Sequence, residues 1–269
     1  MCAICGCSEA QHSHEHDADH HHHGHDHDHD HDHTHTHTHT HTHAPMHAHT
    51  ENGAARRVRL EAEILGKNSD RAGENRRYFA QQRILTLNLV SSPGSGKTTL
   101  LERTIRDLSA QVPFYVVEGD QATERDAERI RRAGAHAVQL NTGTVCHLDA
   151  AMVEGALREL APAAGSVLAI ENIGNLVCPA LFDLGEQARI VVASFAEGDD
   201  KPLKYPYMFR SADLVILNKS DLAPHVEFDV EKFCGYVASL NPRARVLPLS
   251  ATRGDGLSAW YDFIAGARR

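Results

Sequence analysis

The pattern of hydrophobic and polar positions divides the chain in two near residue 56. Beyond that point, short runs that are almost wholly apolar are separated by stretches in which apolar residues recur at helical spacing. Runs of the first kind are typical of strands that are buried on both faces of a parallel sheet. The seven apolar runs are 84–90, 114–120, 136–141, 166–172, 189–195, 213–219 and 244–250.

Helical patterns fill most of the intervals between these runs. They cover 98–110, 123–133, 148–160, 229–240 and 256–267. A charged stretch before the first run places Leu60, Ile64 and Leu65 on one helical face. Strands that alternate with helices predict an α/β fold with a doubly wound, mostly parallel sheet. In such a sheet, ligands bind beyond the carboxyl ends of the strands.

The first 55 residues have a different composition. They hold nine acidic residues, no Lys or Arg, and 19 of the 22 histidines, which alternate with Asp and then with Thr between His12 and His49. So polar a segment cannot bury enough apolar surface to offset the entropy of ordering it. We therefore expect a disordered tail over 1–55, a helical lead-in over 56–82 and a single domain over 83–269.

Composition excludes several classes of protein. The chain carries a net charge of −9, all of it from the tail, so a binder of nucleic-acid phosphates is not expected. No apolar run approaches the roughly 20 residues that cross a bilayer, and the first residues lack the features of a secretory signal. Six cysteines without an export signal indicate reduced thiols that can bind metal. These features predict a cytoplasmic protein with no membrane or nucleic-acid partner.

A glycine-rich segment directly follows the first apolar run and begins a helix. Its sequence, SSPGSGKTT, matches the phosphate-binding loop G-x-x-x-x-G-K-[ST] except that Ser91 replaces the first Gly. Lys97 is expected to reach the β- and γ-phosphates, and the Thr98 hydroxyl to bind Mg²⁺. An ordinary Gly-rich turn is the alternative. The residues expected to bind the nucleotide here are Gly94, Ser95, Gly96, Lys97, Thr98 and Thr99.

A second motif predicts which base is bound. Asn218, Lys219 and Asp221 lie at the end of a strand and match N-K-x-D of GTP-binding proteins. The Asp221 carboxylate can accept hydrogen bonds from the ring N1–H and the exocyclic amine of guanine, which adenine does not offer together. Asn218 is expected to tie the loop together, and the stem of Lys219 to cover the ring. Two residues at the end of the last run resemble the backbone contact to the guanine carbonyl in such proteins, Ser250 and Ala251.

Acidic residues end two other strands. Glu118-Gly119-Asp120 ends the second run, and Glu171 follows the run that begins at Ser166. A carboxylate there can hold Mg²⁺ directly or through water, or orient the attacking water. We expect Asp120 to hold the metal and Glu171 to hold the metal or orient the water, with Lys97 completing the catalytic set. Solvated strand ends are the alternative.

Soft metal ligands occur in the tail in two forms. Cys2, Cys5 and Cys7 form C-x-x-C-G-C, whose thiolates can converge on one ion with the α-amino group as a fourth ligand. Such a set suits square-planar Ni²⁺ or tetrahedral Zn²⁺. The 19 imidazoles that follow are expected to hold several ions loosely, because no fixed geometry is imposed. A purification tag is the simpler alternative for the His-rich segment.

A third group of soft ligands falls within the domain. Cys146 and His147 follow one strand, and Cys178 follows another, so all three are expected at the nucleotide edge of the sheet. There they could couple metal binding to the state of the nucleotide. Each residue alone is more simply explained as part of the packed interior. Cys234, within a helical pattern, is interpreted as packing only.

Taken together, these motifs resemble those of a known family. The leading C-x-x-C-G-C, the His-rich stretch, VSSPGSGKTTL, VVEGDQ, NTGTVCHLDA, IENIGNLVCPA and VILNKSDL are similar to those of the hydrogenase nickel-incorporation GTPases (hydrogenase maturation factor B). The resemblance implies a P-loop GTPase that dimerises with GTP and delivers nickel to [NiFe]-hydrogenase.

The resemblance also implies metal sites and partners. It assigns a tight nickel site to Cys2, Cys5 and Cys7, and a weaker nickel or zinc site to Cys146, His147 and Cys178. The partners it implies are a nickel-binding accessory maturation protein and the precursor of the hydrogenase large subunit. GTP, Mg²⁺, Ni²⁺ and Zn²⁺ are the expected ligands.

Three other functions remain as alternatives. The urease accessory GTPase is the nearest sibling, but it has a Cys-Pro-His motif, whereas Pro179 and Ala180 follow Cys178 here. A nickel storage protein would not need the cysteine groups. A small-molecule kinase would not need the N-K-x-D motif.

Overall fold

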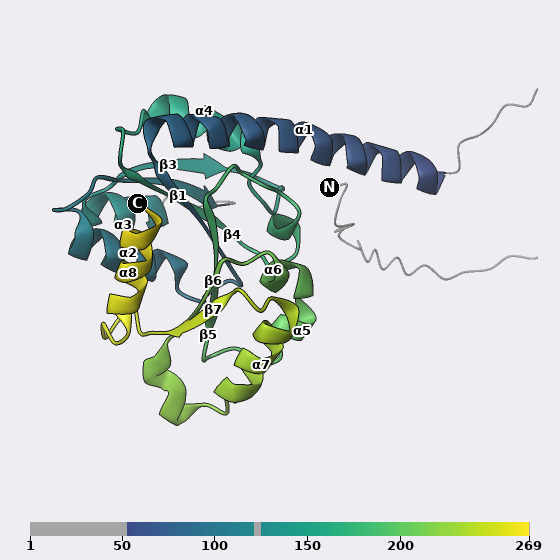
Figure 1. Ribbon diagram of the computed structural model, residues 1–269. Coiled ribbons are helices and arrows are strands. Elements are labelled where there is room, and N and C mark those ends of the chain that lie inside the picture. Colours follow the sequence, from purple (N-terminus) through teal and green to yellow (C-terminus); the bar gives the residue numbers. More distant parts are fainter. Residues whose placement is uncertain (1–52, 121–124, 269) are drawn as a thin grey trace, which may run out of the picture.

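One parallel sheet of seven strands forms the centre of the molecule (Figure 1). The structure, a computed structural model, describes residues 53–120 and 125–268. The strand order is β3-β2-β4-β1-β5-β6-β7, and every neighbouring pair is parallel. The strands are β1 (Leu85–Ser91), β2 (Phe114–Asp120), β3 (His136–Asn141), β4 (Val167–Gly174), β5 (Ala188–Ser194), β6 (Leu214–Asn218) and β7 (Arg245–Pro248).

Helices connect the strands and cover both faces of the sheet. The α-helices are α1 (Gly53–Gln82), α2 (Lys97–Leu108), α3 (Arg125–Ala133), α4 (Ala150–Leu160), α5 (Lys201–Lys204), α6 (Pro206–Arg210), α7 (Val230–Leu240) and α8 (Leu257–Ala267). Two short 3₁₀ helices are η1 (Cys178–Ala180) and η2 (Ser220–His225). Asp149 caps α4 by accepting a hydrogen bond from the backbone N–H of Met152 at 2.8 Å.

The hydrophobic core has two layers because the central strands are apolar on both faces. Every residue of β1 and β5 is buried. On one face, α2, α3 and α8 pack on the sheet, with Trp260 wholly buried among them. On the other face, α1 and α4 cover one half of the sheet, while α6 and α7 cover the half that contains β5 and β6. The carboxyl ends of β1, β2 and β4 therefore meet at one edge, held by a rigid centre.

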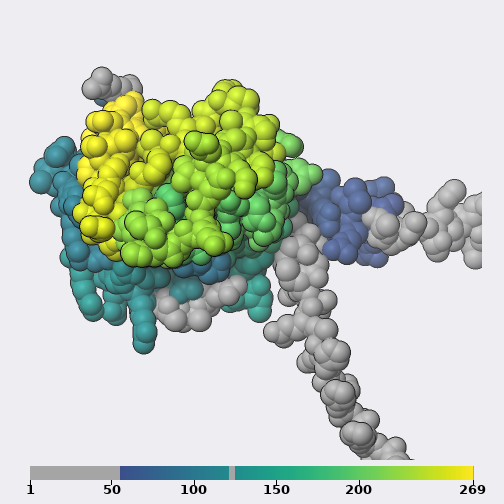
Figure 2. Space-filling view, turned by 90° about the horizontal axis from the view of Figure 1, so that it is seen from below, coloured from purple at the N-terminus to yellow at the C-terminus, as the bar shows by residue number. Residues whose placement is uncertain are grey.

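Helix α1 has two halves that differ in their surroundings. Its second half packs on α4 and buries Ala72 and Phe79. Its first half projects from the body of the protein, as both overall views show (Figures 1 and 2), and exposes Val58 and Leu60. The second half of α1 is thus part of the packed domain, whereas its first half is exposed to solvent.

The predicted α/β fold with a doubly wound parallel sheet is confirmed, and all seven apolar runs are strands. Two short helices, α5 and α6, were not predicted, because Pro202 and Pro206 divide residues 201–210 into pieces too short to show a helical period. Within 53–120 and 125–268, no helix is both long and apolar enough to cross a membrane.

Candidate functional site

The phosphate-binding loop lies between β1 and α2, and its glycines have backbone angles that other residues rarely adopt. Gly94 has a φ of +76° and Gly96 a φ of +99°. A Cβ atom on Gly96 would lie only 2.4 Å from Nδ2 of Asn218. Glycine is therefore required at position 96 both by the backbone conformation and by the close approach of the base-recognition motif.

The residue that replaces the first glycine of the motif has its own contact. Lys97 Nζ donates a hydrogen bond to Ser91 Oγ at 2.8 Å, and both residues are buried. The hydroxyl at position 91 thus orients the amine that the sequence predicts to meet the phosphates.

The predicted base-recognition motif is bonded directly to the phosphate-binding loop. Asn218 Nδ2 donates to the carbonyl of Ser95 at 2.9 Å, and its Oδ1 accepts from the backbone N–H of Ala251 at 3.1 Å. Lys219 Nζ donates to the carbonyl of Gly94 at 2.7 Å. Asn218 therefore ties three loops together, which is the structural role that the sequence predicted for it.

The carboxylate expected to select guanine lies beside the end of β7. Ser250 Oγ donates a hydrogen bond to Asp221 Oδ1 at 2.6 Å. The backbone N–H of Ser220 bonds the carbonyl of Leu249 at 3.0 Å, which fixes the motif against the following strand. The structure thus brings Asp221, Ser250 and Ala251 together, while their contact with a base stays a prediction.

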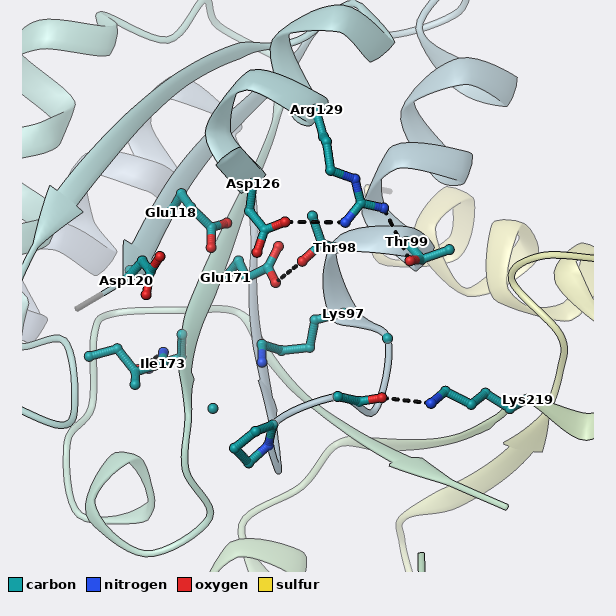
Figure 3. Close-up of a pocket in the computed structure, with 16 residues that line it drawn as sticks. Lys97, Thr98, Thr99, Glu118, Asp120, Asp126, Arg129, Glu171, Ile173 and Lys219 are labelled. Carbon is teal, nitrogen blue, oxygen red and sulfur yellow. Dashed lines mark hydrogen bonds and ion pairs between the residues drawn. The ribbon is translucent and has the colours of Figure 1, made fainter. Parts of the chain in front are cut away.

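A pocket of about 520 Å³ opens at the carboxyl ends of β1, β2 and β4 (Figure 3). Its walls combine the phosphate-binding loop with several acidic residues. The lining residues are Pro93, Gly94, Gly96, Lys97, Thr98, Thr99, Glu118, Gly119, Asp120, Asp126, Arg129, Glu171, Asn172, Ile173, Gly174 and Lys219.

Two buried carboxyl groups face each other in this pocket. Glu118 and Glu171 are paired in register on β2 and β4, and each is only 3% exposed. Glu171 Oε1 accepts a hydrogen bond from Thr98 Oγ1 at 2.7 Å, whereas Oε2 of each glutamate is buried and has no hydrogen-bond partner among the described residues. Burial and the neighbouring Glu171 raise the pKa of Glu118 well above its ordinary value, and burial also raises the pKa of Glu171, against the effect of Lys97.

This chemistry fits a divalent cation. Mg²⁺ is bound by carboxylate and hydroxyl oxygens, and two orphaned carboxylate oxygens next to the Thr98 hydroxyl supply such ligands. A cation would also favour the ionised form of both glutamates. Asp120, the ligand predicted from the sequence, lines the same pocket.

Three charged residues of the pocket were not predicted from the sequence. Glu118 lies near the end of a predicted strand, and the charge it places inside an apolar run is a signal of function that the sequence offers. Arg129 bonds Asp126 at 3.1 Å and Thr99 at 3.2 Å (Figure 3). It also bonds Glu102 at 2.8 Å, so it links α3 to α2. Neither Asp126 nor Arg129 belongs to a recognisable motif, and only the packing of α3 on α2 brings them here.

A second site, rich in soft ligands, lies on the segments that follow β3 and β4. Cys146, His147 and Cys178 place their ligand atoms within 4.8 Å of one another. The sulfur atoms of Cys146 and Cys178 are 3.0 Å apart. Residues 32 positions apart thus converge as the sequence predicted. Two thiols and an imidazole are ligands that suit Ni²⁺ and Zn²⁺.

The imidazole of this metal-ligand group is held in a form that can bind metal. The ring of His147 stacks on Phe182, with the ring centres 3.9 Å apart. Burial lowers the pKa of His147, which favours the neutral ring, and its Nδ1 atom is buried with no hydrogen-bond partner in the part of the chain that the structure describes. Cys234 lies on α7, and burial raises the pKa of its thiol.

The end of β4 joins the two sites. Asn172, next to Glu171, accepts a hydrogen bond from the backbone N–H of Leu148 at 3.3 Å, and Asn175 donates to the carbonyl of Cys146 at 3.1 Å. Between them, Gly174 packs so closely on Pro93 of the phosphate-binding loop that a Cβ atom would lie 3.1 Å from it. One short segment therefore contacts both the phosphate-binding loop and the metal-binding loop.

Two predicted metal-binding elements lie outside the described residues. These are the cysteine group, Cys2, Cys5 and Cys7, and the His-rich stretch 12–49.

Comparison with known proteins agrees with this geometry. Residues 85–248 match a family described as CobW/HypB/UreG, nucleotide-binding domain. The chain is 54% identical over 214 residues to the hydrogenase maturation factor HypB of Rhizobium leguminosarum bv. viciae, which covers 79% of this chain and 72% of that protein.

Two solved structures are similar along most of the described chain. The crystal structure of HypB from Archaeoglobus fulgidus has a TM-score of 0.71 at 40% identity and covers 76% of this chain and 100% of its own. The crystal structure of HypB from Helicobacter pylori in complex with nickel has a TM-score of 0.70 at 41% identity and covers 76% and 95%. With the phosphate-binding loop, the N-K-x-D motif and the paired cysteines in place, this chain belongs to the HypB family of hydrogenase maturation factors.

Proposed function

We propose that this protein is a GTPase that binds nickel and delivers it during maturation of [NiFe]-hydrogenase. The observation that carries the proposal is the close connection of two chemically different sites. A pocket lined by a phosphate-binding loop lies beside a group of two thiols and an imidazole, and the end of β4 contacts both. Such a connection allows hydrolysis to change how the metal is held.

The hydrolysis step follows from the chemistry of the pocket. Water attacks the γ-phosphorus of GTP, and the bond to the β-phosphate oxygen breaks to give GDP and phosphate. Lys97 stabilises the negative charge that develops on the phosphate oxygens. Glu171 orients the water. Thr98, Asp120 and Glu171 would hold Mg²⁺, which neutralises phosphate charge when bound.

Nickel is the cargo in this proposal. Cys146, His147 and Cys178 bind it in the domain, with Zn²⁺ as a competitor for the same ligands. Cys2, Cys5 and Cys7 form a tighter site, and the His-rich stretch holds further ions. Delivery then involves a GTP-dependent homodimer, a nickel-binding accessory protein and the precursor of the hydrogenase large subunit, all in the cytoplasm.

A complementation experiment tests delivery. In cells that lack this protein, hydrogenase activity should be lost and should return either with the wild-type gene or with excess nickel in the medium. A gene carrying Lys97→Ala should not restore activity at low nickel. If excess nickel fails to restore hydrogenase activity, the protein acts in something other than nickel supply. Urease activity, measured in the same cells, tests the urease alternative.

A further inference from the structure

Helix α1 is bonded to both of the segments that carry the metal-ligand group. Asn68, which is 8% exposed, accepts a hydrogen bond from the backbone N–H of Ala150 at 2.9 Å and donates to the carbonyl of Asp183 at 2.8 Å. Ala150 lies three residues after His147, and Asp183 lies five residues after Cys178. A single amide on α1 therefore spans the two segments whose ligands must converge on one ion.

A second asparagine repeats this arrangement two turns further along α1. Asn75 is 3% exposed, and its Nδ2 donates to the carbonyl of Ala150 at 2.9 Å and to that of Leu184 at 3.1 Å. Next to it, Gly185 has a φ of +90°, and a Cβ atom there would lie 2.7 Å from the carbonyl oxygen of Ala72. The segment after Cys178 is thus pressed directly against the backbone of α1.

Part of the contact between α1 and the ligand segments is open and lined by polar side chains. A pocket of about 540 Å³ lies among α1, Asp149 and Phe182, and Phe182 is the ring that stacks on His147. Polar side chains of α1 surround this pocket, among them Lys67, Asp70 and Arg71. The two buried amides are therefore among the contacts that hold α1 to the ligand segments, and a buried amide that is hydrogen-bonded to both segments favours one geometry over others.

We propose that Asn68 and Asn75 are positioning residues of the metal site, through which α1 sets the separation of the two ligand segments and hence the nickel affinity. The proposal rests on the proposed binding of nickel by Cys146, His147 and Cys178. Since partners that orient metal ligands from outside change affinity by about 10- to 100-fold, Asn68→Ala and Asn75→Ala should each weaken nickel binding by about 10-fold.

The experiment uses the full chain with Cys2, Cys5 and Cys7 changed to Ser. The thiolate-to-nickel charge-transfer absorption then reports the thiols of the domain, and the same chain with Cys146→Ser supplies the baseline. Nickel is titrated in, and unfolding temperature is measured alongside. Asn68→Asp is included because it has the same size and keeps the bond from Ala150, yet cannot donate to Asp183. It should weaken nickel binding without leaving a cavity.

Asn241→Ala is the matched control. The side-chain amide of Asn241 also holds a helix in place, since it donates to the carbonyls of Phe209, Arg210 and Ala212. These bonds join α7 to α6 and do not involve the segments that carry the metal ligands. It should lower the unfolding temperature and leave the nickel titration unchanged. If Asn68→Ala, Asn68→Asp and Asn75→Ala all titrate like the parent chain, α1 does not position the site. If the parent itself shows no absorption above the Cys146→Ser baseline, Cys146, His147 and Cys178 do not bind nickel, and this inference fails together with the proposed nickel site.

Discussion

The nucleotide pocket and the metal-ligand group lie along the same edge of the sheet but are built by different means. One stretch of consecutive residues forms the centre of the pocket, because the loop between β1 and α2 supplies Gly94, Gly96, Lys97 and Thr98, and the strand ends add carboxyl groups. The metal-ligand group uses residues 32 positions apart, and side-chain amides hold their segments together. The phosphate-binding loop can therefore be recognised from a short stretch of sequence, whereas the metal-ligand group forms only when distant segments pack together.

The largest effect expected from this comparison is the loss of hydrolysis in Lys97→Ala. The amine stabilises charge that develops on the phosphate, so turnover of GTP should fall by about 100- to 1000-fold. Phosphate release is the measurement, and Lys204→Ala is a control because Lys204 lies on α5 and pairs with Asp200. Near-normal turnover in Lys97→Ala would remove the phosphate-binding loop from the mechanism.

The next effect concerns the soft ligands. Cys146→Ser removes a thiolate from the metal-ligand group, so nickel affinity at this site should fall by more than the roughly 10- to 100-fold typical of outer-shell changes. Cys234→Ser should leave the affinity unchanged, since Cys234 lies on α7. Equal nickel affinity in the two variants would mean that the cysteine pair serves only packing.

A smaller effect is expected at the base-recognition motif. Asp221→Ala removes an acceptor for two guanine N–H groups. The binding of GTP should therefore become weaker by about 1.5–3 kcal/mol, which is roughly 10- to 100-fold in affinity. Asp221→Asn should instead bind xanthosine triphosphate better than GTP, because an amide can donate to the carbonyl that replaces the guanine amine. If both variants keep the wild-type GTP affinity with an unchanged circular dichroism spectrum, Asp221 does not read the base.

The effect of the bound nucleotide on nickel affinity should be smaller than the effect of the Asp221 variants on GTP affinity. A non-hydrolysable GTP analogue should change nickel affinity at the metal-ligand group by about 5-fold relative to GDP, since the end of β4 contacts both sites. Asn172→Ala should reduce this ratio, because Asn172 accepts a bond from Leu148 of the metal-binding loop. Titration of nickel with each nucleotide measures the ratio, and identical affinities would make the metal-ligand group a static site.

The smallest expected effect is that of the His-rich stretch on hydrolysis. Deletion of residues 12–49 should remove most bound nickel equivalents and leave GTP turnover nearly unchanged. Metal analysis and phosphate release on the same samples test both statements. A large fall in turnover would mean that the His-rich stretch works within the domain.

How much the sequence predicted depends on whether the cause was local. The strands were predicted because burial on both faces leaves an apolar run such as that of β1. The phosphate-binding loop was predicted because all of its motif residues lie within one short loop of the chain. Arg129 and Asp126 were not found, since their place in the pocket depends on the packing of α3 on α2. Asn68 and Asn75 were missed for the same reason, because the sequence of a charged helix does not show which distant groups its asparagines bond to.

The division of α1 into a projecting half and a docked half has a practical consequence for shortened forms of the protein. Residues 55–60 are all exposed, so a protease that cuts there would remove few contacts of the domain. A cut beyond Asn68 would separate the ligand segments from their support while sparing every residue of the phosphate-binding loop. As far as the contacts of the folded domain are concerned, the boundary between residues that can be removed and residues that cannot therefore falls inside this helix, shortly before Asn68, and not at the residue where the helix begins.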